Sequence, residues 1–262
     1  MKVGSLFSGV GLTDFGLELA GFEHAWFCEI EPYARDILSK RWPGRTIYKD
    51  IKELDGNEVE KVDLLSGGFP CQDVSCGGKR KGITKETRSG LWYEYARIIR
   101  QVRPRYVLIE NVPGLRSKGF EIVLKELAEI GYDAEWIVLS AAQFGAPHLR
   151  ERLFIVAYPH SAGDDDPTGP RRLFTEERIN GIDFQLDSEA SWNNLRVNRA
   201  SPESICKAYP GPQIHRMDDG HTDWLDRLKA LGNGITPQQA YFVGSLIQDH
   251  SFNVLNLLNK KT

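Results

Sequence analysis

Segments that read as short buried strands alternate with segments that read as helices along the first 157 residues. Apolar, β-branched and aromatic runs predict strands at 3–7, 24–29, 46–48, 62–65, 106–109, 134–139 and 153–157. Capping residues and apolar spacings of three and four predict helices at 13–20, from Pro32, at 91–101 and around 120–127. Such alternation predicts an α/β fold with a mixed, mostly parallel sheet and helices on both faces.

The regular pattern stops near Pro159 and returns late in the chain. Residues 160–216 are polar and rich in turn-forming residues, whereas residues 224–246 regain an ordered pattern around Gly232-Asn233-Gly234. A chain of 262 residues has room for one α/β domain and a small appendage. We therefore expect a first domain at 1–159, a small irregular lobe at 160–216, and a segment at 217–262 that returns to the first domain.

The composition is that of an ordinary globular protein, with 41% hydrophobic and 26% charged residues and a net charge of −3. No run of about 18 apolar residues predicts a membrane span. The four cysteines, at 28, 71, 76 and 206, have no CxxC spacing, so we expect reduced thiols, no bound metal and a cytoplasmic location.

Two of the expected strands end in side chains that can carry chemistry. Cys71 follows the strand at 62–65 through Gly67-Gly68-Phe69-Pro70, and Glu110 directly follows the strand at 106–109. The carboxyl ends of parallel strands meet at one edge of a sheet, where ligands and chemistry gather. A thiol and a carboxyl group that converge there predict covalent nucleophilic catalysis with an assisting acid.

A glycine-rich turn and two acidic residues predict an adenosine cofactor. The turn Phe7-Ser8-Gly9-Val10-Gly11 follows the first strand but lacks the full GxGxxG pattern of pyrophosphate binding. Glu29, about 20 residues later at the end of the second strand, can accept hydrogen bonds from both ribose hydroxyls. Asp50, after the third strand, can bind the adenine amino group. This set fits S-adenosylmethionine better than a dinucleotide.

Five short motifs in order resemble those of the DNA (cytosine-5)-methyltransferase family, in a compact phage-type or restriction-modification-type member. They are Leu6–Gly11, Gly68–Gln72, Glu110–Val112, His148–Arg152 and Gly232–Asn233, which are similar to the cofactor, Pro-Cys, ENV, QxRxR and GN motifs. The resemblance implies that the Cys71 thiolate adds to carbon 6 of a flipped-out cytosine while Glu110, with a raised pKa, binds ring nitrogen 3. Arg152 is then expected to hold the base oxygen, and Arg150 to support the loop or the backbone.

The resemblance also implies binding residues and partners. S-adenosylmethionine is expected to contact Phe7, Gly9, Gly11, Glu29, Ile30, Asp50, Ile51, Pro70, Leu91 and Asn233. Double-stranded DNA is the expected partner of Gln72, Lys79, Arg80, Lys81, Arg88, Arg196 and Arg199, the last two in the recognition lobe at 160–216. For the basic residues at 79–88, a solvated surface loop is as well supported by the sequence as a DNA contact. We expect a monomer, with a cognate restriction endonuclease as a separate partner and DNA-associated action in a nucleoid or phage-infected cell.

Three other functions stay open at this stage. A tRNA cytosine-5 methyltransferase has the same scaffold, but the Cys-Phe-Thr tripeptide of such enzymes is absent. A silent DNA-binding homologue has no chemical need for intact Cys71, Glu110 and Arg152. A dinucleotide oxidoreductase is disfavoured by the incomplete glycine pattern. The chain departs from the family at Leu12, at His148 in place of Gln, and at Gly234 in place of Ser or Ala.

Overall fold

A computed structural model describes residues 1–70, 90–144, 146, 148–160, 172–175, 179 and 235–259, with side chains up to residue 252. The strands are β1 (Lys2–Leu6), β2 (Glu23–Cys28), β3 (Thr46–Tyr48), β4 (Leu64–Gly67), β5 (Tyr106–Asn111), β6 (Tyr132–Leu139) and β7 (Arg152–Pro159). The α-helices are α1 (Leu12–Leu19), α2 (Pro32–Arg41), α3 (Leu91–Val102), α4 (Phe120–Ile130) and α9 (Pro237–Asn259). Two 3-10 helices, η2 (Pro113–Ser117) and η3 (Ala141–Phe144), complete the described elements.

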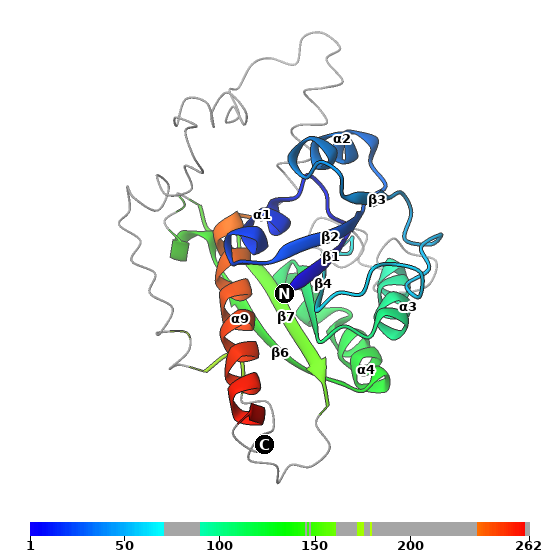
Figure 1. Ribbon diagram of the computed structural model, residues 1–262. Helices are drawn as coiled ribbons and strands as arrows, with labels where there is room; N and C mark the ends of the chain where they lie inside the picture. The colour runs from blue at the N-terminus through cyan, green and yellow to red at the C-terminus, as the bar shows by residue number, and fades with distance from the viewer. Residues whose placement is uncertain are drawn as a thin grey trace.

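The seven strands of the described residues form one sheet in the order β3-β2-β1-β4-β5-β7-β6 (Figure 1). The strands β1 to β5 pair in parallel, and β7 runs antiparallel to both of its neighbours, β5 and β6. The chain leaves β1 toward β3 and then crosses back to β4 on the other side of β1, which makes a topological switch point there. Ligands of open α/β sheets bind outside the carboxyl ends of the strands at such a point.

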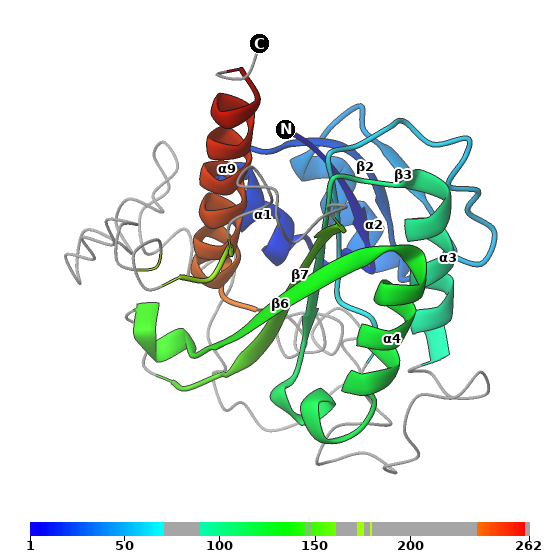
Figure 2. The ribbon, with the colours of Figure 1, turned by 90° about the horizontal axis from the view of Figure 1, so that it is seen from below.

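Helices cover both faces of this sheet, as the sequence predicts. Alternate strand residues point to opposite faces. Val107 and Ile109 of β5 pack under α3 and α4, whereas Tyr106 and Leu108 pack under α1 and α9. Figure 2 shows α3 and α4 on one side of the sheet and α1 and α9 on the other. The predicted fold, a mixed and mostly parallel sheet between two helical layers, is confirmed.

The N-terminus of α1 lies closer to the glycine turn than the sequence predicts. The sequence predicts a helix at 13–20, but the helix begins at Leu12 and Gly11 is the N-cap residue. Gly11 has φ +81°, a left-handed conformation that glycine adopts without steric cost. A Cβ on Gly11 would lie 2.5 Å from the Trp42 ring, so the turn and α2 also pack closely here.

The C-terminal helix α9 packs on α1. The expected boundary near residue 216 and most of the lobe at 160–216 lie outside the described residues. None of the helices in the described part of the chain has the length and apolar character needed to cross a membrane.

Candidate active site

The carboxyl ends of five strands share one row of the sheet. Tyr48 pairs with Cys28, Cys28 with Leu6, Leu6 with Gly67, and Gly67 with Ile109. The residues that follow this row in β1 to β4 therefore leave the sheet at one edge, as the sequence predicts. The strand β5 is longer than the predicted strand at 106–109 and continues at this edge through Glu110 and Asn111. This edge presents the glycine turn, Glu29, the approach to Pro70, and Glu110.

The antiparallel strand β7 adds an arginine to the same edge. Glu110 pairs with Phe154 and Asn111 with Leu153, so Arg152 at the start of β7 lies beside the end of β5. The Nε atom of Arg152 is 3.0 Å from Oε1 of Glu110, and the two side chains are only 13% and 15% exposed. The sheet topology thus joins two of the predicted catalytic residues that are 42 positions apart.

Burial raises the pKa of Glu110 to about 7, although the nearby charges of Arg152 and Arg150 and a hydrogen bond from Arg152 act to lower it. The charged form of a carboxyl group loses solvation when buried, and here that cost exceeds the attraction to the two arginines. The upward direction agrees with the sequence prediction. A carboxyl group with a pKa near neutrality can hold a proton and donate it to a base.

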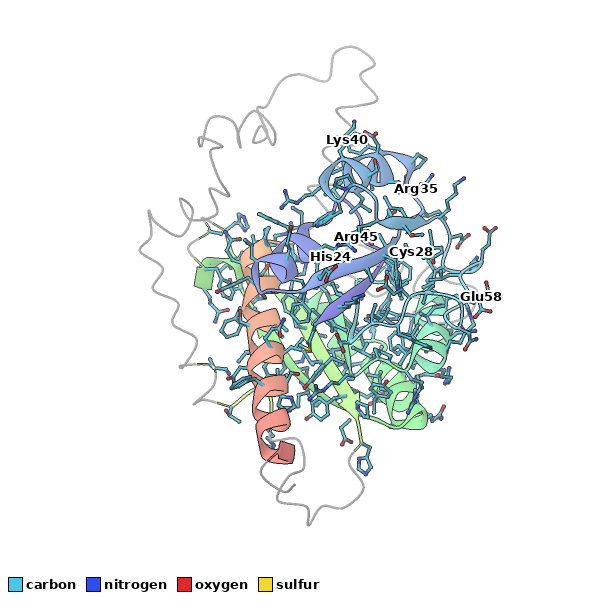
Figure 3. All side chains as sticks on the ribbon, in the orientation of Figure 1. His24, Cys28, Arg35, Lys40, Arg45 and Glu58 are labelled. Atoms are coloured by element: carbon cyan, nitrogen blue, oxygen red, sulfur yellow. The ribbon has the colours of Figure 1, made fainter. Side chains whose placement is uncertain are left out.

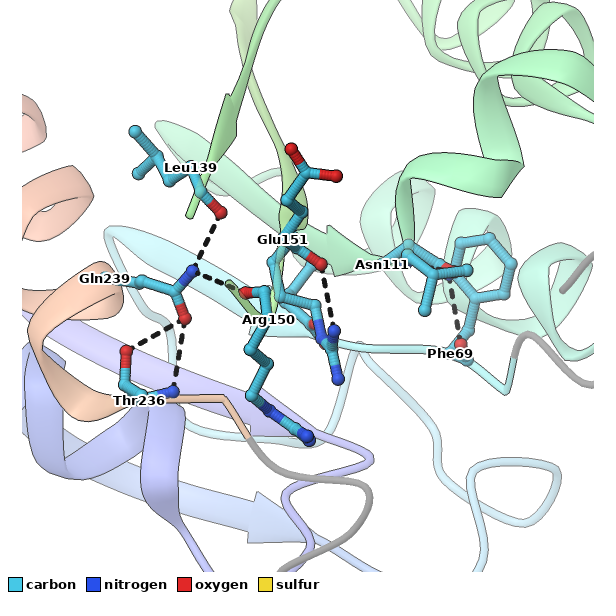
Figure 4. Close-up of polar contacts among 10 residues, drawn as sticks. Phe69, Asn111, Leu139, Arg150, Glu151, Thr236 and Gln239 are labelled. Carbon is cyan, nitrogen blue, oxygen red and sulfur yellow. Dashed lines mark hydrogen bonds and ion pairs between the residues drawn. The ribbon is translucent and has the colours of Figure 1, made fainter. Parts of the chain in front are cut away.

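Gly68 brings the backbone that leads to Pro70 against this carboxyl group. A Cβ on Gly68 would lie 2.6 Å from Oε2 of Glu110. Asn111, buried on β5, donates from Nδ2 to the carbonyl oxygen of Phe69 at 3.2 Å (Figure 4). Its Oδ1 accepts from Val112 N–H at 2.9 Å. Sequence reasoning missed Asn111 as a site residue, although its place in the motif after Glu110 was a signal.

We predict that Gly68→Ala displaces the Glu110 carboxyl group and slows the methyl transfer that the sequence resemblance implies by about 10²-fold, the scale expected for a misplaced catalytic group. The thermal midpoint is expected to change little, because the obstructing atom is the end of a side chain. Gly67→Ala is the contrasting variant, since its Cβ would lie 2.9 Å from the Leu6 carbonyl oxygen. It is expected to lower the thermal midpoint clearly. Unchanged single-turnover rates in Gly68→Ala would contradict the assigned contact.

Glu29 is fixed at the end of β2 by backbone donors. Its Oε2 accepts from Gly9 N–H at 2.7 Å and its Oε1 from Glu31 N–H at 2.8 Å. Arg35 of α2, labelled in Figure 3, donates from Nη1 to the carbonyl oxygens of Glu29 and Ile30 at 3.0 and 2.5 Å. The carboxylate is therefore oriented at the glycine turn, and each oxygen keeps a lone pair for a further donor.

The other predicted cofactor residues before residue 92 differ in position and exposure. Phe7 has φ +53°, which turns the chain sharply after β1. Ile30 is 63% exposed, an apolar surface beside Glu29. Asp50 accepts from Lys52 N–H at 2.9 Å, while Ile51 is buried in the core on the α3 side. Pro70 and Leu91, at the two ends of the undescribed segment 71–89, are half-buried.

We predict that Glu29→Ala weakens S-adenosylmethionine binding by about 10- to 100-fold, the scale of one or two hydrogen bonds to a charged group. Calorimetry measures this affinity. Glu23→Ala is the matched control, because Glu23 lies at the opposite end of β2 and pairs with Arg45 on the surface at 3.0 Å. Equal affinities in the Glu29 and Glu23 variants would refute the ribose contact.

Several predicted site residues lie outside the described residues. They are Cys71, Gln72, Lys79, Arg80, Lys81, Arg88, Arg196, Arg199 and Asn233. Cys28, by contrast, is a free thiol buried in the core, and burial raises its pKa to about 12. Cys28 is thus protonated at neutral pH and unsuited to nucleophilic attack. The described residues contain no group of three or more His, Cys, Asp or Glu side chains that could hold a metal ion.

Solved structures share this fold across nearly the whole chain. A protein encoded in an E. coli prophage and described as a DNA modification methyltransferase superposes with a TM-score of 0.61 at 18% identity, over 98% of this chain and 99% of that one. The Dnmt2 methyltransferase of S. pombe superposes with a TM-score of 0.59 at 18% identity, over 95% and 99% of the two chains. At such identities the likeness establishes the fold alone.

Sequence relatives establish the family. Type II methyltransferase M.NgoBI of Neisseria gonorrhoeae is 35% identical over 240 residues, which cover 89% of this chain and 74% of the relative. M2.BsuMI of Bacillus subtilis and M.FnuDI of Fusobacterium nucleatum are 39% and 38% identical over 60% of this chain. The chain matches only 42% and 47% of the length of these two relatives. The family model for C-5 cytosine-specific DNA methylases matches residues 1–208, so the chain belongs to the C-5 cytosine-specific DNA methylase family, whose cofactor is S-adenosylmethionine.

Proposed function

We propose that the chain transfers a methyl group from S-adenosylmethionine to carbon 5 of cytosine in duplex DNA. The observation that carries this proposal is the buried pair of Glu110 and Arg152 at the strand ends, with the pKa of Glu110 raised to about 7. This pair lies beside Gly68, three residues before Cys71. A protonated carboxyl group and a guanidinium suit the edge of a cytosine, which offers ring nitrogen 3 and a carbonyl oxygen as acceptors.

In the proposed reaction the Cys71 thiolate forms a bond to carbon 6 of cytosine. The carbon 5–carbon 6 double bond opens and its electron pair moves to carbon 5, while Glu110 protonates ring nitrogen 3 and Arg152 holds the base oxygen. Carbon 5 then forms a bond to the methyl carbon, whose bond to sulfur breaks. Loss of the carbon 5 proton to water and of the nitrogen 3 proton to Glu110 restores the ring and releases the Cys71 thiolate.

The glycine turn and Glu29 fit the proposed cofactor. S-adenosylmethionine, when bound, supplies a methyl group activated by a positively charged sulfur. A Cβ on Gly9 would meet no described atom within 4 Å, so the described residues leave room beside the turn whose backbone N–H orients the Glu29 carboxylate. Glu29 would accept the ribose hydroxyls there, and the exposed side chain of Ile30 would pack on the adenine ring.

The target carbon is stacked inside a duplex, so the proposed reaction needs the cytosine to rotate out of the helix. The basic residues Lys79, Arg80, Lys81 and Arg88 are proposed to contact the DNA backbone, and the lobe at 160–216 with Arg196 and Arg199 to read the sequence. The relatives from Bacillus subtilis and Neisseria gonorrhoeae are Type II methyltransferases, which favours a restriction-modification setting with a separate endonuclease. We propose a monomer that acts on DNA in the cytoplasm.

A covalent-trapping experiment tests this function. Release of Cys71 requires removal of the proton at carbon 5, and fluorine in its place cannot be removed in this way. The Cys71 adduct is therefore expected to persist on 5-fluorocytosine-substituted duplex DNA in the presence of tritiated S-adenosylmethionine. A labelled protein–DNA complex that survives denaturation is the expected result. The DNA must be of mixed sequence so that the unknown target site is represented.

Two other outcomes would overturn the proposal in different ways. An adduct on fluorinated tRNA and none on DNA would make RNA the substrate of the same chemistry. The absence of an adduct on either nucleic acid, together with normal cofactor binding by calorimetry, would indicate a silent homologue.

A further inference from the structure

Gln239, on the first turn of α9, is a fully buried amide that no motif in the sequence singles out. Its Nε2 donates to the carbonyl oxygen of Leu139 at 2.8 Å and to that of Arg150 at 3.2 Å. Its Oε1 accepts from the Thr236 hydroxyl at 3.0 Å and from Thr236 N–H at 3.2 Å. The whole hydrogen-bonding capacity of the amide is therefore used, as Figure 4 shows.

The two carbonyl groups that Gln239 joins are the two ends of one loop. The chain leaves β6 at Leu139, passes through η3, and enters β7 at Arg152, which pairs with Leu139 across the sheet. Within this loop Leu149 accepts from Ala141 N–H and from the Ser140 hydroxyl, both at 2.7 Å. Gln239 therefore links the two ends of the loop, next to the point where the chain passes from Arg150 into β7 at Arg152.

The backbone of Arg150 needs such support. Its φ is +32°, a backbone conformation that residues other than glycine rarely adopt and that persists only where surrounding contacts impose it. The next residue but one, Arg152, forms the ion pair with Glu110 at 3.0 Å and donates from Nη1 to the Glu151 carbonyl oxygen at 2.9 Å. A change in the Arg150 backbone would thus move the guanidinium that meets Glu110.

We propose that Gln239 is a positioning residue for this reaction: its buried amide fixes the Arg150 backbone and so presents Arg150 and Arg152 to Glu110. This inference rests on the proposed function, in which Glu110 and Arg152 act on the cytosine. It also gives the C-terminal helix α9 a role in the site, through a residue that is 89 positions from Arg150 in the sequence.

The proposal predicts a titration effect that a merely structural role would not produce. Arg152 and Arg150 are the charged groups that act on Glu110 within the described residues, and both lower its pKa. In Gln239→Leu the donor is lost and the arginines are free to shift, so the titration midpoint of Glu110 is expected to rise. The methyl-transfer rate is expected to fall by about 10- to 100-fold, as for a small misplacement of catalytic groups.

Gln238→Leu is the matched control. Gln238 is the preceding residue of the same helix turn and is 5% exposed, and its amide makes no hydrogen bond to the described part of the chain. Thr236→Val is a milder second variant that removes one of the two bonds to Oε1. It is expected to shift Glu110 in the same direction by less, and it keeps the proposal testable if Gln239→Leu does not fold.

Two readouts separate this proposal from the proposed function. The carboxyl titration of Glu110 is followed by NMR of protein labelled with ¹³C at glutamate side chains, with the Glu110 signal identified from Glu110→Gln. A raised midpoint in Gln239→Leu or Thr236→Val, with Gln238→Leu unchanged, supports positioning even if no methyl transfer is found. An unmoved midpoint in both Gln239→Leu and Thr236→Val, or an equal shift in Gln238→Leu, overturns it whether or not wild-type protein methylates DNA.

Discussion

In Cys71→Ala, methyl transfer to DNA is expected to fall below detection while the affinities for DNA and S-adenosylmethionine change by less than about threefold. The physical reason is that carbon 5 of cytosine is a poor nucleophile until a thiolate adds to carbon 6, and alanine cannot add. Covalent catalysis of this kind replaces one difficult step with two easier ones, so its loss affects the rate and not binding. Single-turnover rates, with fluorescence anisotropy for DNA and calorimetry for the cofactor, measure the three quantities.

Cys76→Ala provides the matched control for this variant. Cys76 is a second thiol five positions along the chain, and the sequence assigns no chemistry to it. It is expected to retain the wild-type rate and the adduct on 5-fluorocytosine DNA. If Cys71→Ala retained near wild-type turnover, or Cys76→Ala also lost it, Cys71 could not be the specific nucleophile.

The sheet and its helical layers could be predicted from the sequence because the signal for them is local. Strand residues alternate between the two faces, so Leu153 and Ile155 lie in one core while Phe154 and Val156 lie in the other. The positions of Glu29 and Glu110 follow from the same signal, since each comes directly after a buried run. Once the strands are parallel and in register, both carboxyl groups must leave at one edge.

The start of α1 could not be predicted in the same way, because it depends on a contact between distant segments. Thr13 has a side chain suited to an N-cap. Gly11, however, adopts the left-handed conformation and packs tightly against Trp42, the residue that follows α2. The Asn111 and Gln239 amides are a stronger case, since both bind backbone carbonyl groups that are 42 to 100 positions away. Every residue has a backbone carbonyl group, so the sequence does not indicate which carbonyl groups these two amides bind.

The raised pKa of Glu110 could be predicted from the sequence only in part. The sequence predicts its direction from the role that the resemblance implies, but the balance between burial and two arginines depends on the folded site. Burial exceeds the attraction of Arg152 and Arg150, which leaves the pKa of Glu110 at about 7. An ion pair that removed all of this shift would leave a carboxylate with no proton to give.

Glu110→Gln is therefore expected to slow the chemical step by about 10²-fold or more, the scale of general acid catalysis. Glutamine keeps the size of the side chain and can donate a hydrogen bond from its amide, but it cannot transfer a proton to ring nitrogen 3. The loss is expected in the single-turnover rate at saturating DNA. A change confined to the Michaelis constant would make Glu110 a binding residue instead.

The pH dependence gives a second and independent test of the same residue. With a pKa of about 7, Glu110 is about nine-tenths protonated at pH 6 and about one-tenth protonated at pH 8, so its contribution to the rate falls as the pH rises through 7. Formation of the Cys71 thiolate acts in the opposite direction, and the two together predict a bell-shaped profile for the wild-type protein. In Glu110→Gln the falling limb is expected to disappear, while the control Glu126→Gln, whose side chain pairs with Arg100 on the surface of α4 at 2.6 Å, keeps it. A falling limb that survives unchanged in Glu110→Gln would assign that titration to another group and remove Glu110 from the proton transfer.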